Sequence, residues 1–104
     1  MAEETKNTEA QAYTAFDHSF EDRFSGGDTV AVSYRFRRPT PQEVGRAQKQ
    51  VLKDSSQAMR NLCIGCVHAE DKAKMVADFE AYPGLPVTMG TAIFGSIGVG
   101  SLGN

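Results

Sequence analysis

The chain has 104 residues and a mass of 11.3 kDa, which is the size of one domain. Apolar residues make up 40% of it and the net charge is −2, so the composition fits a folded chain with a modest core. No apolar run approaches the 20 or so residues of a transmembrane helix. The polar start MAEETKNTEA is unlike a secretory signal. With only two cysteines, this predicts a reducing cytoplasm and no disulfide framework.

The first third of the chain predicts a β-hairpin or a single strand. Phe16, Phe20 and Phe24 recur every four residues, which suits a helix, but Phe20 and Phe24 would also share one face of a strand. The residues at 25–28, Ser-Gly-Gly-Asp, predict a turn. Apolar residues then alternate with small or polar ones, in the clearest strand pattern of the chain: Val30, Val32, Tyr34 and Phe36. If Phe20–Phe24 is the partner strand, residues 19–37 form a hairpin.

The strongest local signal marks the start of a helix. Pro39 stops the strand, Thr40 fits the N-cap and Pro41 fits the first helical position. Glu43 stands where it completes a capping box with Thr40. The apolar stripe of this helix consists of Val44, Ala47, Val51 and Leu52.

Three further helices are predicted from their start and stop signals. Asp-Ser-Ser at 54–56 begins the second and His-Ala-Glu-Asp at 68–71 the third, which Pro-Gly at 83–84 ends. Pro86 opens the fourth, which is expected to fray beyond Gly95. The apolar sides comprise Met59, Leu62, Cys63, Cys66 and Val67; then Met75, Val76, Phe79 and Tyr82; then Val87, Ile93, Phe94 and Ile97.

Together these elements predict an α+β fold, mainly α, in which an N-terminal β-hairpin or strand packs on three to four short helices. The globular domain would span residues 13–97, between a disordered tail at 1–12 and a flexible Gly-rich end at 98–104. The predicted core residues are Val32, Tyr34, Phe36, Val44, Val51, Leu62, Cys66, Val76, Phe79 and Ile93.

The two cysteines form a C-x-x-C motif. Thiol oxidoreductases place this motif at the start of a helix, whereas Cys63 and Cys66 lie mid-helix on its apolar side, which favours two buried core residues. His68 and the distant His18 would complete a set of four zinc ligands, but His68 points away from the thiols on a helix. Haem attachment would need histidine where Val67 stands.

Charge is unevenly distributed along the chain. Residues 1–28 carry a net charge of −5 and residues 29–53 carry +5. Arg35, Arg37 and Arg38 in the basic part could contribute to a nucleic-acid surface. Because the acidic part can neutralise them, a solvated strand face or a protein contact is the favoured interpretation.

No set of residues predicts catalysis, a cofactor or a metal site. The neighbours Asp-His-Ser at 17–19 have the residue types of a triad, but sequence neighbours do not converge in that way. The stretch 84–104 is uncharged and is open to three interpretations: a membrane-surface segment, an oligomerisation or protein-binding element, and a last core helix with a flexible end. The last is favoured; in the second, Gly90 and Thr91 would let another backbone approach.

The order of four short motifs is distinctive. They are Tyr-Arg-Phe-Arg-Arg-Pro-Thr at 34–40, Ala-Met-Arg-Asn-Leu at 58–62, Val-His-Ala-Glu-Asp at 67–71 and Phe-Glu-Ala-Tyr-Pro-Gly-Leu-Pro at 79–86. This order resembles small tail-assembly proteins of tailed bacteriophages and prophages, which often show "F-R-R-P-T", "A-x-x-N-L" and "E-x-Y-P-G-L". The resemblance covers roughly residues 34–94.

The resemblance implies a non-enzymatic assembly chaperone in the cytoplasm of a bacterial host. Such proteins bind the helical tape-measure protein before the tail tube forms, and they tend to form homo-oligomers. A helical client needs an apolar groove. The residues predicted to form it are Val87, Met89, Ile93, Phe94 and Ile97, and Met59 and Met75 would suit it if they did not fill the core. No nucleic-acid or membrane partner is expected. The alternatives are a structural tail component of the completion or connector type, and a small thiol or zinc protein using the C-x-x-C.

Overall fold

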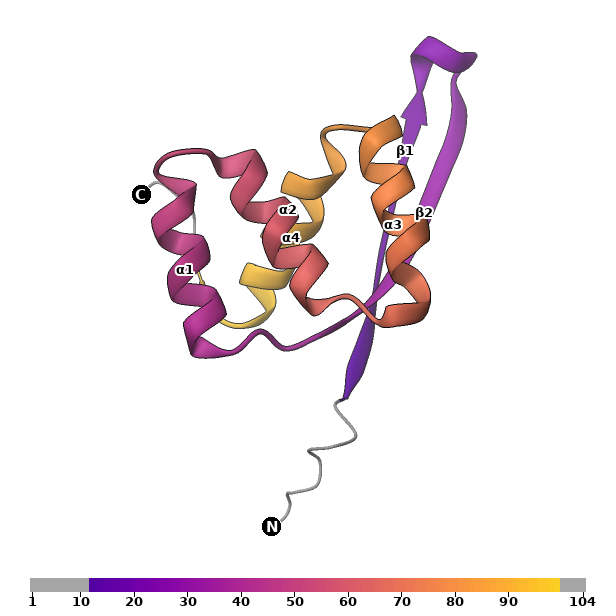
Figure 1. The fold of residues 1–104 in the computed structure, drawn as a ribbon. Helices are drawn as coiled ribbons and strands as arrows, with labels where there is room; N and C mark the ends of the chain where they lie inside the picture. The colour runs from indigo at the N-terminus through magenta and orange to yellow at the C-terminus, as the bar shows by residue number, and fades with distance from the viewer. Residues whose placement is uncertain (1–11, 100–104) are drawn as a thin grey trace.

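The computed structural model describes residues 12–99, so most of the predicted N-terminal tail and of the Gly-rich end lies outside the described residues. An antiparallel hairpin is followed by four helices, which confirms the predicted fold class (Figure 1). The elements are β1 (Tyr13–Asp22), the short 3-10 helix η2 (Arg23–Ser25), β2 (Asp28–Arg37), α1 (Pro41–Val51), α2 (Ser55–Cys66), α3 (Ala69–Ala81) and α4 (Leu85–Ser96).

The undecided segment at residues 13–24 is a strand that ends in a turn. Phe16 and Phe20 are four residues apart, which is an even number, so their side chains share one face of β1. That face packs against the core. Phe24 lies beyond the strand in η2 and is fully exposed, so it shares no face with Phe20. The hairpin pairs ten consecutive residues, from Tyr13 opposite Arg37 to Asp22 opposite Asp28. Its outer end extends past the helices as an arm (Figure 1).

The helices pack as a small bundle beside the root of the hairpin. α2 packs against both α1 and α4, while α3 lies along the hairpin (Figure 1). The predicted capping box of α1 is confirmed: Glu43 N–H donates to Thr40 Oγ1 at 3.1 Å, and Thr40 N–H donates to a Glu43 carboxylate oxygen at 2.8 Å. Among the described residues, no helix combines the length and the apolar character needed to cross a bilayer.

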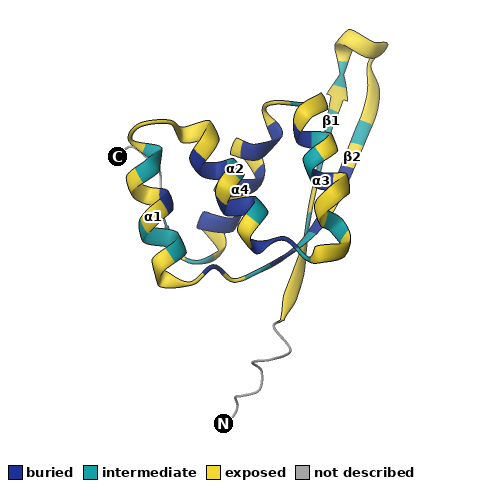
Figure 2. Cartoon of the chain, in the orientation of Figure 1, coloured by how far each residue is buried: buried dark blue, intermediate teal, exposed yellow. Residues whose placement is uncertain are grey.

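The core lies where β2 meets α2, α3 and α4 (Figure 2). Seven predicted core residues are buried: Val32, Tyr34, Phe36, Leu62, Cys66, Phe79 and Ile93. The other three are only partly buried: Val44, Val51 and Val76. α1 lies at the margin of the bundle and buries only Ala47, and α3 turns Met75 rather than Val76 inward. Methionines at 59, 75 and 89 fill the space, as their flexible side chains allow.

Gly90 lets α4 approach α2 closely. A methyl group at Gly90 would lie 2.7 Å from Cβ and 2.5 Å from Sδ of Met59, which is too close for any side chain. The small size of Gly90 therefore allows two helices of the same chain to pack closely. It does not serve the approach of a second backbone, which the sequence suggested.

Two arginines of β2 tie the hairpin to the helices. Arg35 donates to both carboxylate oxygens of Asp71 on α3, at 3.0 and 2.9 Å. Arg37 forms a paired contact with Glu43 of α1, at 2.9 Å to each oxygen, and donates to the carbonyl of Gly65 in α2 at 2.6 Å. The ion pair at Arg37 therefore joins one strand and two helices at one point.

Candidate functional site

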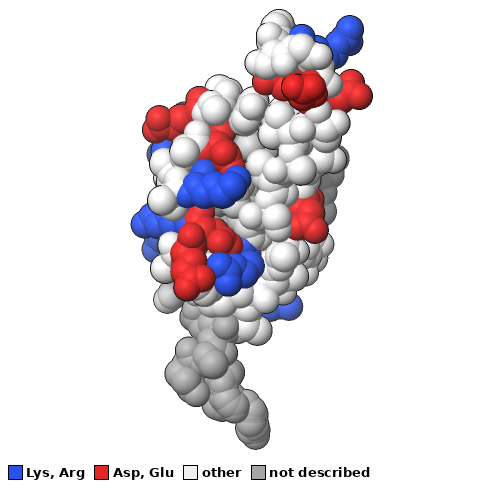
Figure 3. Space-filling view, turned by 90° about the vertical axis from the view of Figure 1, so that its right-hand side faces the viewer, with Lys and Arg blue, Asp and Glu red and all other residues white. Residues whose placement is uncertain are grey.

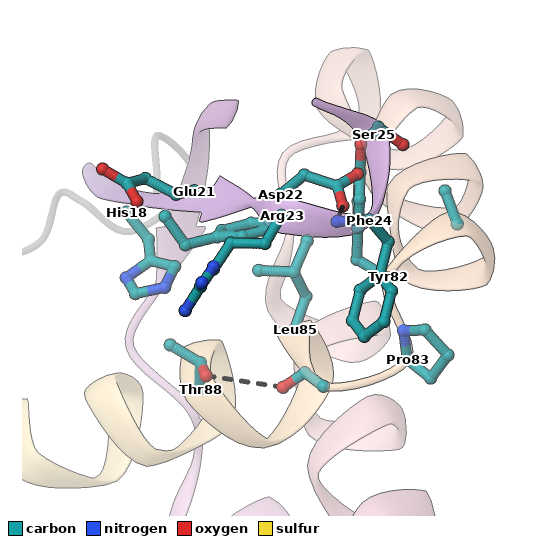
Figure 4. A pocket seen from close by; sticks show the side chains of 13 residues that line it. His18, Glu21, Asp22, Arg23, Phe24, Ser25, Tyr82, Pro83, Leu85 and Thr88 are labelled. Carbon is teal, nitrogen blue, oxygen red and sulfur yellow. Dashed lines mark hydrogen bonds between the residues drawn. The ribbon is translucent and has the colours of Figure 1, made fainter. Parts of the chain in front are cut away.

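An open cleft of about 690 Å³ separates the arm from the turn between α3 and α4 (Figure 4). Its volume lies within the range of ligand-binding pockets, although a cleft open to solvent suits a protein segment better than a small molecule. One wall consists of His18, Phe20, Glu21, Asp22, Arg23, Phe24 and Ser25, and the other of Ala81, Tyr82, Pro83, Gly84, Leu85 and Thr88.

The tip of the arm is built by local hydrogen bonds and two glycines. The Asp22 carboxylate accepts the backbone N–H of Phe24 at 3.2 Å, and the Asp22 carbonyl accepts that of Gly27 at 2.8 Å. Gly26 and Gly27 have φ angles of 88° and 81°, which other residues rarely adopt. This turn leaves the Phe24 side chain 102% exposed. A fully exposed phenylalanine on a projecting turn is an apolar contact point without a partner in the fold.

The opposite wall is mostly apolar and has several local contacts. Tyr82 follows the end of α3, and its ring meets the ring of Phe20 edge-to-face with 5.1 Å between their centroids. Leu85 begins α4, and its backbone N–H donates to the Tyr82 carbonyl at 2.9 Å. The Thr88 hydroxyl also reaches the Gly84 carbonyl, at 3.4 Å (Figure 4). These contacts hold the turn between α3 and α4, which leaves Tyr82 and Pro83 partly open to a partner while Leu85 is buried in the core.

The arm is acidic. Between Asp17 and its partner Ser33, the arm carries four carboxylates, at Asp17, Glu21, Asp22 and Asp28, and one guanidinium, at Arg23, which leaves a net charge of −3. Carboxylates gather just below the tip of the arm, whereas positive and negative groups alternate on the left-hand side of the same view (Figure 3). A partner that docks along the arm would therefore gain from positive charge.

The predicted basic cluster has a structural role. Hydrogen bonds to Asp71, then to Glu70, raise the pKa of Arg35, and hydrogen bonds to Glu43 raise that of Arg37. Both guanidinium groups are thus engaged with carboxylates of the helices, and of the three arginines only Arg38 is exposed. Nothing in this arrangement forms a continuous basic surface.

The two thiols lie in the core, as predicted. Burial raises the pKa of Cys63 to about 12 and that of Cys66 to about 11, so both are protonated near neutral pH. His68 caps α3, because its Nδ1 accepts the backbone N–H of Glu70 at 3.1 Å. Within residues 12–99, no three His, Cys, Asp or Glu side chains gather as ligands for a metal.

The residues that the sequence singled out for protein binding do not form one surface. Met89, Ile93 and Phe94 are buried against the rest of the bundle and cannot contact a partner in this conformation. Ile97 is partly buried, and Val87 is 38% exposed. The apolar stripe of α4 therefore completes the core, which corrects the expectation of an open groove at these three positions.

The cleft and the exposed Phe24 were missed by the sequence analysis. The signal that could have found them was the Ser-Gly-Gly-Asp turn at 25–28, which follows an aromatic residue directly. An apolar residue beside a tight turn points outward when the strands on both sides of that turn are paired.

A model of the DUF6848 family, a domain family of unknown function, matches residues 19–103. The chain belongs to this family. A DUF6848 domain thus comprises most of the hairpin and all four helices described above.

The fold recurs in a solved structure, that of the uncharacterised protein RBSTP2171 of Bacillus stearothermophilus. The two share 19% sequence identity over 88% of each chain, with a TM-score of 0.69. At this identity the likeness concerns the fold alone. A search of curated proteins found no match for this DUF6848 member.

Proposed function

We propose that this protein is a non-enzymatic tail-assembly chaperone of a phage or prophage, which binds the tape-measure protein in the host cytoplasm. The observation that supports protein binding is the projecting arm, with Phe24 fully exposed beside an open cleft. An exposed aromatic side chain beside a cleft offers the kind of apolar contact that is enriched at protein interfaces. The resemblance over residues 34–94 supplies the class of client.

The arm, rather than α4, is the surface on which this proposal now rests. Phe24 at the tip, with Phe20 and Tyr82 beside it, offers aromatic contacts, and aromatic residues contribute most to binding energy at interfaces. Val87, in the first turn of α4, would lie at the margin of the contact, whereas Ile97 lies beyond the other end of α4, near Thr14 and Phe16. The buried thiols, protonated near neutral pH, disfavour the alternative of a thiol-based protein.

The test is co-purification of the tagged protein with each tail protein encoded beside it. Tape-measure protein should be captured, and Phe24→Ser should abolish or strongly reduce the capture. Leu52→Ser is the matched control, because Leu52 is also a large exposed apolar residue, 84% exposed, but lies at the turn between α1 and α2.

Two results would refute the proposal. Capture of tube or connector proteins, with this protein retained in finished particles, would indicate a structural tail component. Capture of no tail protein would show that the resemblance does not extend to function.

A further inference from the structure

The two outer edges of the hairpin differ. Near its root, the edge of β2 is occupied: the backbone N–H of His68 donates to the Arg35 carbonyl, the backbone N–H of Arg35 donates to Asp71, both at 2.8 Å, and Phe36 forms a β-bridge with Val67. Among the described residues, no backbone hydrogen bond joins residues 29–33 of β2 to an element other than β1, so the edge of β2 is open towards the tip. Among the described residues, no hydrogen bond joins the backbone of residues 14–21 in β1 to any element other than β2. The outer edge of β1 is therefore an open row of donors and acceptors.

Of the devices that usually block strand addition, this edge has only charged side chains. The other devices are proline, lysine, bulges and covering segments. β1 contains no proline or lysine, and its ten residue pairs run without a bulge. Its charged side chains are the carboxylates of Asp17, Glu21 and Asp22. A second copy of β1 would bring like charges together, so these residues oppose self-pairing, but they do not oppose a basic strand.

The cleft gives this edge room for another segment. Phe20, Glu21 and Asp22 are consecutive in β1, and neighbours in a strand point to opposite faces. Because all three line the same cleft, the cleft reaches the edge of the strand itself. On the far wall, Tyr82 and Pro83 supply apolar contacts for side chains of an added segment.

We propose that the outer edge of β1 takes up an extended basic segment of a partner protein as a third strand. The inference rests on the proposed protein-binding function and specifies the form of the client segment as extended rather than helical. Main-chain hydrogen bonds along β1 would supply affinity. The arm's net charge of −3 would select basic residues and make binding weaken as salt rises.

The probe is a nine-residue peptide of alternating arginine and valine with blocked ends, added to the full chain. Backbone amide signals of residues 14–21 should shift, and their hydrogen exchange should slow. When the same peptide is N-methylated at its three central amides, it loses backbone hydrogen-bond donors on both of its edges. This peptide should not bind. A peptide with glutamate in place of arginine should not bind either.

Two variants with the same net charge show where on the protein the basic peptide binds. Glu21→Gln removes a carboxylate from the arm, and Gln48→Lys adds a charge on an exposed position of α1. Both raise the net charge by one. Glu21→Gln should weaken binding of the basic peptide by about two- to fivefold, and Gln48→Lys should leave it nearly unchanged. Circular dichroism should show that both variants remain folded.

Besides a failure of the basic peptide to bind, three outcomes would overturn the inference. One is binding of the N-methylated peptide as tight as that of its parent, and another is equal weakening by both variants. The third is a dimer in which amides of β1 are protected without peptide, because a second copy would then occupy the edge. If the basic peptide does not bind while tape-measure protein is still captured, strand addition fails and the proposed function stands.

Discussion

Replacement of Gly90 by alanine isolates the steric requirement at the contact between α2 and α4. In an open helix, Gly→Ala stabilises by about 1 kcal/mol. At Gly90 the new methyl would lie 2.7 Å from Cβ of Met59, so the two helices must separate. Overpacking of this kind costs about 1–3 kcal/mol. The two effects together predict a net change between zero and about 2 kcal/mol of destabilisation for Gly90→Ala.

Gly45→Ala is the matched control, since Gly45 lies within α1 with nothing inside 4 Å of the added methyl. It should stabilise by about 1 kcal/mol. The difference between the two variants, about 1–3 kcal/mol, is the steric cost alone. Urea unfolding followed by circular dichroism measures both free energies of unfolding. Equal stabilisation by the two substitutions would refute the close approach of α4 to α2.

Two further predictions concern titrating groups. Hydrogen bonds from Arg37 lower the pKa of Glu43 from 4.5 to about 2, so its stabilising contribution is complete above pH 4.5 and lost as the pH falls towards 2. Glu43→Gln should lower the urea midpoint at pH 7 and reduce its decline between pH 5 and 2; an unchanged acid decline would contradict this. Because burial raises the pKa of Cys63 and Cys66, alkylation should be slow in the native protein and fast in urea. If the thiols of the native protein were alkylated as fast as free cysteine, this packing would be excluded.

Local signals in the sequence predicted the helices well, because each helix start depends on its own few residues. Thr40, Pro41 and Glu43 form the capping box that their spacing indicates. Residues 13–24 were ambiguous for a physical reason: a spacing of four residues is close to one helical turn and equals two strand repeats. Only pairing with β2 decides between them.

The candidate site was less accessible to sequence reasoning, because it depends on contacts between distant segments. The cleft forms where the end of β1 faces the turn after Tyr82, and no local pattern brings these together. The apolar stripe of α4 suggested a binding groove, but core and groove share one pattern, and the structure buries Met89 and Phe94. The sequence also could not indicate which edge of the hairpin is free, because the contact between β2 and His68 depends on the fold.

Burial decreases along the hairpin from its root to its tip, so the two ends tolerate substitutions to different degrees. At its root, Tyr34 and Phe36 are core residues, and Arg37 joins three elements, so most substitutions there unfold or weaken the domain. At its tip, η2 contributes no buried residue, so substitutions of its three residues leave stability nearly unchanged, unlike substitutions of Gly26 and Gly27 with their positive φ angles. Relatives with the same scaffold are thus free to diversify the tip and to acquire different partners while the helices and the hairpin root stay the same.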